Sequence, residues 1–386
     1  MKYHIWFILL AALLLAACSE ESGQTVTPGP APVDNGSKPD HAPTPEVQDV
    51  PLWLVAATRG SGEVYLDAAD DYETYDPIQF FLMSGAQETS INQKREGLFT
   101  YDPNAAVPGW SSTIGIKDPK NCLYGFSPAT AASCTISPAV GSSYDGGAVL
   151  KMTNLNAASG NDLCVIVGVR HGSSKAATDE TPERGSFLFT MDAENYISLL
   201  LDHVFARIDF KIKLGSEYAK MRYIKIKKLE LQSSYELSGI TVTLKSGADA
   251  EVSYATSKIA ENGSPSVGTI YDFSADTDPA NSEGKDITLD GTVFPGFFAP
   301  DDASQIANSL SLVCTYDVYA IDAFNNNKIG TRVRENCVAV NSLTSVPSLA
   351  SMRRGKKTSL TLTVEPTYLY QLSEDELDNP SIRIGD

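Results

Sequence analysis

The sequence predicts an all-β protein, on three observations. Apolar and polar residues alternate in several segments, which is the period of a strand with one buried face and one wet face. Clusters of Gly, Asn, Asp and Ser separate these segments at short intervals, as in sandwich domains built from many short strands. Outside the N-terminal apolar run, the sequence has no long, well-capped amphipathic helix.

The chain starts with an apolar run, Ile5 to Leu15, that is too short to span a bilayer. This run has the shape of a secretory signal, so residues 1–17 are expected to be a signal peptide. Small residues precede Cys18, which resembles the lipobox of bacterial lipoproteins, where the cysteine is acylated. The next residues, Ser19-Glu20-Glu21, resemble the acidic tag that directs such proteins to the outer face of the outer membrane. An ordinary signal peptide with an incidental cysteine is the alternative.

Residues 18–50 form a Pro-rich leader with little apolar surface to bury, so we expect an extended, disordered spacer. An apolar burst, Leu52 to Ala57, follows it and ends in Thr58-Arg59-Gly60. We place a domain boundary near residue 200, which gives an N-terminal β-sandwich domain over 51–200 and a C-terminal one over 201–386.

The clearest strand of the second half runs from Ala206 to Leu214, where apolar and charged residues alternate strictly. Its successor has Ile224 and Ile226 in one phase and Leu229 and Leu231 in the other. A phase change of one residue around Lys227-Lys228 predicts a β-bulge, since otherwise half of the strand would face the wrong way. The alternation returns in residues 240–244 and 360–364.

The composition excludes some classes of function. A formal charge of −18 and a pI near 4.6 argue against nucleic-acid binding, which needs a basic footprint. The sequence has no phosphate-binding loop, zinc-protease motif or nucleophile elbow, so we expect neither an enzyme nor a cofactor or metal site. Two acidic stretches, 67–76 and 276–286, lack the ligand spacing of a calcium loop and are expected to be solvated. His203 is expected to be a structural histidine because no nucleophile motif surrounds it.

One basic group stands out in so acidic a chain. We interpret it as the wet face of two adjacent strands, although it could also meet an acidic neighbour such as another copy of the protein. Its members are Lys211, Lys213, Lys220, Arg222, Lys225, Lys227 and Lys228.

Five cysteines remain besides Cys18, and an odd number implies at least one thiol or an intermolecular pair. Residues 310–340 are predicted to be a hairpin around a two-residue loop at Asn325-Asn326. In that register Cys314 and Cys337 lie opposite each other, within reach of a disulfide. Two buried reduced thiols are the alternative, and the state of the other three stays open. These three are Cys122, Cys134 and Cys164.

Taken together, several segments resemble the fimbrillins, the subunits of type V fimbriae of gut and oral anaerobes. They are the lipobox, the Pro-rich leader, the burst ending in Ala57-Thr58-Arg59, the strand Leu201 to Ile208 and the C-terminal stretch from Gly355 to Ser373. The resemblance implies two transthyretin-like β-sandwich domains in tandem. It also implies export as an outer-membrane lipoprotein, cleavage after an arginine by a trypsin-like protease, and polymerisation by donor-strand exchange.

Carried over to this chain, the cut lies between Arg59 and Gly60 and releases the strand Leu52 to Ala57. The resemblance assigns the donor role to the C-terminal segment, with candidate groove fillers Tyr368, Leu369, Tyr370, Leu372, Ile382 and Ile384. The acidic stretch 373–380 ends in proline and interrupts one long donor strand. An uncleaved anchor subunit that keeps its lipid is therefore an alternative.

The expected partners are other fimbrial subunits, the outer membrane, an Arg-specific protease and a host or bacterial surface ligand. A second alternative is a surface glycan-binding lipoprotein, whose signature would be aromatic residues exposed on one face. Four candidate aromatics are too scattered along the sequence to indicate such a face. They are Trp53, Tyr101, Trp110 and Tyr124.

Overall fold

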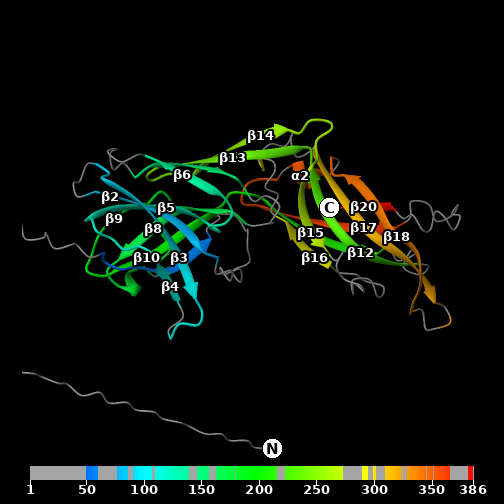
Figure 1. Ribbon diagram of the computed structural model, residues 1–386, viewed down its shortest axis with the longest axis horizontal. Coiled ribbons are helices and arrows are strands. Elements are labelled where there is room, and N and C mark those ends of the chain that lie inside the picture. The colour runs from blue at the N-terminus through cyan, green and yellow to red at the C-terminus, as the bar shows by residue number, and fades with distance from the viewer. Residues whose placement is uncertain are drawn as a thin grey trace, which may run out of the picture. The chain divides into compact units, whose positions relative to one another are not determined.

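Strands make up nearly all of the described secondary structure (Figure 1). The computed structural model describes residues 49–59, 76–85, 90–106, 109–138, 146–155, 162–178, 180–214, 222–272, 289–293, 299–300, 309–322, 324, 328–344, 346–350, 352–365 and 381–385. The helical elements with described bounds are η2 (Lys175–Thr178) and α2 (Pro347–Ala350), with four residues each. The predicted all-β class is thus confirmed, while the transthyretin-like arrangement stays a prediction.

Several predicted features lie outside the described residues. They are the signal peptide with Cys18, the Pro-rich leader up to residue 48, Gly60, and the acidic stretches apart from Asp76. No helix in the described part of the chain is long and apolar enough to cross a bilayer.

The first sheet has eight strands in the order β1-β10-β8-β5-β2-β3-β4, with β9 paired to β5. These strands are β1 (Leu52–Arg59), β2 (Ile78–Gly85), β3 (Gln93–Asp102), β4 (Gly109–Ser112), β5 (Lys120–Ser127), β8 (Cys164–Gly172), β9 (Leu188–Thr190) and β10 (Asn195–His203). All neighbours are antiparallel except β1, which runs parallel to β10. A parallel pair cannot be closed by a tight turn, so β1 enters the sheet as a separate segment.

A second sheet, in the order β14-β13-β7-β6, shares one buried core with the first. Its strands are β6 (Ser133–Ser137), β7 (Ala148–Thr153), β13 (Tyr235–Leu244) and β14 (Glu251–Lys258). The alternation predicted for residues 240–244 is confirmed, since Ile240, Val242 and Leu244 all point into this core. The β13–β14 hairpin therefore completes the first core although it lies beyond residue 200, and the division into 51–200 and 201–386 stays a prediction.

A second core lies between two further four-stranded sheets, β16-β11-β19-β20 and β15-β12-β17-β18. Their strands are β11 (Arg207–Leu214), β12 (Arg222–Ser233), β15 (Ser266–Asp272), β16 (Leu289–Val293), β17 (Leu310–Asp322), β18 (Lys328–Ser342), β19 (Lys357–Glu365) and β20 (Ser381–Gly385). The alternating strand predicted after Ala206 is β11, where Ile208 and Phe210 are 0% and 1% exposed. Their burial against β12 and β17 residues follows from the period of two.

The bulge predicted around Lys227-Lys228 is confirmed. The pairing of β12 with β17 shifts register between Ile226 and Lys228. Ile224 and Ile226 before the shift and the leucines 229 and 231 after it are all buried in the second core. The extra residue thus keeps both halves of the strand facing inward.

The predicted register of the β17–β18 hairpin is wrong. Cys314 lies opposite Ala339, and Tyr316 lies opposite Cys337, so the two cysteines are offset by two residues. Next to the loop, Asp322 lies opposite Lys328, one residue short of the predicted partner. Three register shifts then insert three extra residues into β18 before the cysteines, which leaves a net offset of two. Both cysteines are thiols in the structure. Diagonal neighbours on antiparallel strands have Cα atoms about 7–8 Å apart, beyond the usual reach of a disulfide. A bond between them would therefore require the backbone to move.

Candidate functional site

The candidate site is the β1 seat, the place beside β10 that β1 fills at the edge of the first sheet. Leu52 and Leu54 are 2% and 5% exposed and belong to the first core, whereas Trp53 between them is 46% exposed. The burst that the sequence predicts to be a core strand is thus confirmed as a strand with one buried face. Fully burying a leucine side chain stabilises the folded state by roughly 1.5–3 kcal/mol. These two leucines are therefore the main apolar contacts that keep β1 in the sheet.

Backbone hydrogen bonds fix the N-terminal end of this strand. Val50 and Ile116 form an isolated antiparallel bridge, in which each amide donates to the other carbonyl at 2.8 Å. A Cβ atom on Gly115 would lie 2.4 Å from the carbonyl oxygen of Val50. Glycine is therefore required at this position for the two segments to approach.

An ion-pair cluster around Asp49 closes the same end. Arg95 Nη1 donates to Asp49 Oδ2 at 2.9 Å, and Lys117 Nζ lies 3.4 Å from Oδ1. Arg95 also donates through Nη2 to the carbonyl of Gly115 at 2.7 Å, so one guanidinium joins both segments. Burial raises the pKa of Asp49, but the hydrogen bond and charge of Arg95, with Lys117, outweigh it and lower the pKa below 3.8.

The other end of β1 is Arg59, the residue predicted to be the cut site. Its backbone is the last of the strand and lies opposite Leu201 of β10. Because Arg59 ends the strand, a cut after it would separate all of β1 from the chain that follows. Among the described residues, β1 would then be held by the contacts above, by its pairing with β10 and by its contact with β4.

The C-terminal segment is described only at its end. Residues 381–385 form β20, which pairs antiparallel with β19 at the edge of its sheet, with Ile382 opposite Val364 and Ile384 opposite Leu362. The other predicted donor residues lie outside the described residues. They are Tyr368, Leu369, Tyr370 and Leu372. In this structure, two candidate groove fillers therefore belong to a strand of their own chain.

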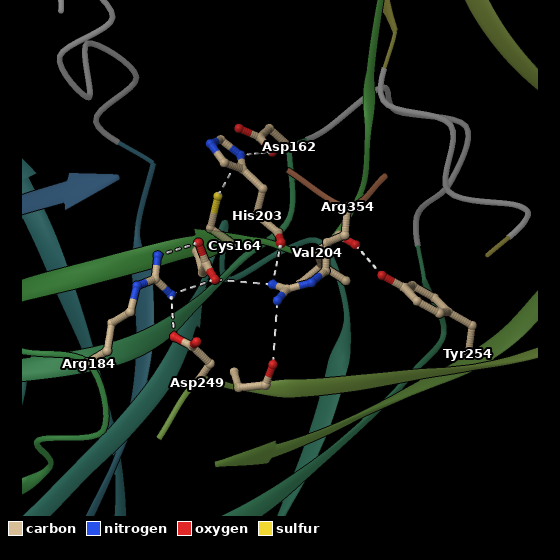
Figure 2. Close-up of polar contacts among 10 residues, drawn as sticks. Asp162, Cys164, Arg184, His203, Val204, Asp249, Tyr254 and Arg354 are labelled. Atoms are coloured by element: carbon tan, nitrogen blue, oxygen red, sulfur yellow. Dashed lines mark hydrogen bonds and ion pairs between the residues drawn. The ribbon is translucent and has the colours of Figure 1, made fainter. Parts of the chain in front are cut away.

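A second polar cluster gathers at the end of β10 (Figure 2). Arg184 donates to both carboxylate oxygens of Asp202, at 2.9 and 3.2 Å, and Arg354 donates to Oδ2 at 3.2 Å. Arg354 also donates to the carbonyls of His203 at 3.0 Å and Ala250 at 3.4 Å. The hydrogen bond with Asp202 raises the pKa of Arg184 further, which burial opposes.

This cluster joins segments of the two cores. Arg354 lies in the turn before β19, and the following residues run beside the chain that leaves β10: the amide of Gly355 donates to Phe205 and that of Arg207 to Lys356. Tyr254 of β14 donates to the carbonyl of Val204 on the same stretch. The carboxylate of Asp202 is therefore a shared acceptor at the joint.

Next to this joint, His203 lies in a buried group with Asp162 and Cys164 (Figure 2). His203 Nδ1 is 2.7 Å from Asp162 Oδ1 and 3.5 Å from Cys164 Sγ. A nucleophilic triad uses one imidazole nitrogen for the nucleophile and the other for the carboxylate. Here both partners meet the same nitrogen, which argues against that chemistry and fits the structural role predicted for His203.

The described members of the basic group are split between two sheets, and Lys220 lies outside the described residues. The prediction that it covers two adjacent strands is wrong, because β11 and β12 belong to different sheets. Lys225 is 6% exposed and lies over the ring of Tyr319 at 5.3 Å, while Lys228 pairs with Glu230 at 2.6 Å. These lysines take part in local contacts rather than in one continuous basic face.

Two of the four predicted aromatics come together. Tyr101 of β3 lies opposite Trp110 of β4, and their rings meet edge to face at 5.5 Å. Both side chains are half-buried, whereas Tyr124 is 1% exposed and belongs to the first core.

Sequence reasoning missed the polar residues at both clusters. Asp49 precedes Arg95 by 46 residues, and Asp202 precedes Arg354 by 152. Neither pair has a local spacing that could have indicated the contact. The only local signal near Arg354 is the glycine that follows it, which indicates a turn: Gly355 has a φ of 73°.

No protein-family model matches the chain, and no curated protein is similar enough to match. Among solved structures, a fimbrial protein from Bacteroides vulgatus shares 13% identity over 87% of this chain and 98% of its own, with a TM-score of 0.37. A proposed cell adhesion protein from Bacteroides fragilis has 11% identity over 87% and 97%, with a TM-score of 0.42. Another from Bacteroides uniformis has 12% identity over 88% and 98%, with a TM-score of 0.38. The structural neighbours are thus fimbrial and adhesion proteins of Bacteroides.

Proposed function

We propose that this chain is a structural and adhesive subunit of a cell-surface fimbria. It is exported as a lipoprotein through Cys18 and anchored in the outer membrane. Cleavage after Arg59 then licenses assembly with other fimbrial subunits by donor-strand exchange. The observation that carries this proposal is β1: an edge strand with two buried leucines whose last residue is the arginine.

The physical basis is the groove that β1 fills. While the chain is intact, β1 occupies its own seat and the subunit stays monomeric. Once β1 leaves, β10 presents unpaired backbone groups, and the positions of Leu52 and Leu54 become an apolar groove. A strand from another copy can pair with these backbone groups and fill the groove with its apolar side chains. Such a head-to-tail contact does not close on itself, so it extends into a filament.

The donor must match the groove in spacing. Leu52 and Leu54 are two residues apart, and so are Ile382 and Ile384, which would face the same side of an extended strand. Before donation, β20 must leave its pairing with β19. That step limits the rate of exchange, whereas the uncut subunit stays monomeric because β1 still fills its groove.

Cleavage is tested on the full chain with two proteases. Trypsin-treated protein should form ladders that survive mild denaturant, whereas Arg59→Ala protein should stay monomeric. Arg59→Lys is the matched control, because trypsin cuts after lysine and an Arg-specific protease does not. It should form ladders with trypsin alone. If Arg59→Ala protein polymerises like the wild type, cleavage after Arg59 is not required for assembly.

An uncleaved anchor subunit is the first alternative, and the closure of the β1 seat by Asp49 and Arg95 supports it. An anchor would keep its lipid, so N-terminal sequencing of the surface form distinguishes them. A new N-terminus at Gly60 supports the polymerising subunit. A form that begins only at Cys18 supports the anchor.

A glycan-binding lipoprotein is the second alternative, supported by the half-buried pair of Tyr101 and Trp110. Sugar rings stack on aromatic faces, so Trp110→Ala should abolish retardation in glycan-containing native gels if this reading holds. Wild-type protein that migrates unretarded in every glycan gel would exclude it for those glycans.

A further inference from the structure

The buried group of Asp162, Cys164 and His203 points to a second site. We propose that these three side chains bind one divalent transition-metal ion, with zinc as the best fit. Their donor atoms all lie within 4.8 Å of one another. The histidine and cysteine are 1% and 0% exposed, and the carboxylate side chain is 9% exposed.

The donor set selects the class of metal. A thiolate, an imidazole nitrogen and a carboxylate oxygen form a ligand set that suits zinc and related first-row ions. Calcium and magnesium ions are bound by oxygen ligands, so they should bind weakly to a site that offers a sulfur and a nitrogen atom. A tetrahedral ion would take these three side chains and keep one position for a water molecule.

Charge balance explains why a divalent ion suits so buried a place. A thiolate from Cys164, a carboxylate from Asp162 and a neutral His203 carry two negative charges together. A divalent cation among them makes the group neutral, which lowers the cost of burying charge. The ion replaces protons, because the thiol must lose its own and Nδ1 must present a lone pair. Affinity therefore rises with pH.

The site also has a place in the fold. Cys164 is the first residue of β8, and His203 is the last of β10, directly opposite it in the sheet. A metal ion would fasten Asp162, which precedes β8, to the end of β10. The stretch Val204 to Arg207, which leads to the second core, begins there. Binding should therefore stabilise the joint as well as the sheet.

Cobalt titration of the full chain, first stripped with a chelator, tests the proposal. Cobalt bound through a thiolate gives a charge-transfer band in the near ultraviolet. We expect this band to saturate at one equivalent and to disappear when zinc is added. Zinc should also raise the melting temperature. Cys164→Ser should abolish the band, and Asp162→Asn and His203→Gln should each weaken binding at least about tenfold.

Cys122→Ser is the matched control, because Cys122 is a 1% exposed cysteine of the same sheet outside this group. It should bind cobalt like the wild type. The proposal is overturned if the wild type gives no band at one equivalent, or if the band survives Cys164→Ser. Should that variant fail to fold, Asp162→Asn decides, since an amide keeps the size of the side chain. Unchanged affinity in folded Asp162→Asn protein would likewise refute the site.

Discussion

Leu54→Ala tests directly whether β1 can leave its seat without unfolding the sheet. Leu54 is 5% exposed, and replacing a buried leucine with alanine costs about 2–5 kcal/mol in tightly packed cores. An edge strand can collapse partly around the gap, so we expect about 2 kcal/mol. If this energy acts on β1 alone, the population with β1 detached rises about 30-fold.

Hydrogen exchange measured by mass spectrometry is the assay. Strand β10 pairs with β1 over Asn195–Leu201, and alternate amides of this range face β1, so those amides should exchange about 30-fold faster in Leu54→Ala protein. Amides of β2, at the other side of β5, should keep their wild-type rates. Leu188→Ala is the control, since this leucine of β9 is 47% exposed and its loss should change little.

Two results would refute the reasoning. Unchanged exchange in β10 would mean that Leu54 does not hold β1 in place. Equal acceleration in β10 and β2 would mean that β1 opens only when the whole sheet unfolds. In that case a cut after Arg59 could not release it alone.

Three further predictions concern single residues. Asp202→Asn removes the charge that two arginines share, and should lower the free energy of unfolding by about 1–3 kcal/mol in urea denaturation; a loss below about 0.5 kcal/mol would contradict the joint described here. The pKa of Asp49 is lowered in the folded protein, so its ion pairs stabilise the fold fully above the ordinary pKa of an aspartate, and this stabilisation is lost as the pH falls through the lowered pKa. Protease nicking near β1 should therefore increase on acidification in the wild type, and much less so in Asp49→Asn protein. Gly125→Ala would put a Cβ atom 2.2 Å from the carbonyl oxygen of Gln79, so the melting temperature should drop clearly, and a drop of less than about 2 °C would contradict that contact.

The sequence by itself determined the local structure where one face of a strand is buried. Ile208 and Phe210 alternate with charged residues, and this period of two is sufficient to predict both the strand and its inward face. The bulge in β12 was equally readable, because its leucines could reach the core only through an extra residue. The β1 burst was predicted for the same reason, since a short apolar run needs a core to enter.

Only the tertiary structure decided which segments meet. The β13–β14 hairpin completes the first core although residues of the second precede and follow it. The three shifts in β18 moved Cys337 away from Cys314, because a register depends on both strands and their loop together. Asp202 and Arg354 meet across 152 residues without any pattern in either neighbourhood. Local periodicity specifies the face that a residue presents, but its partner depends on strand pairings between segments that are distant in the chain.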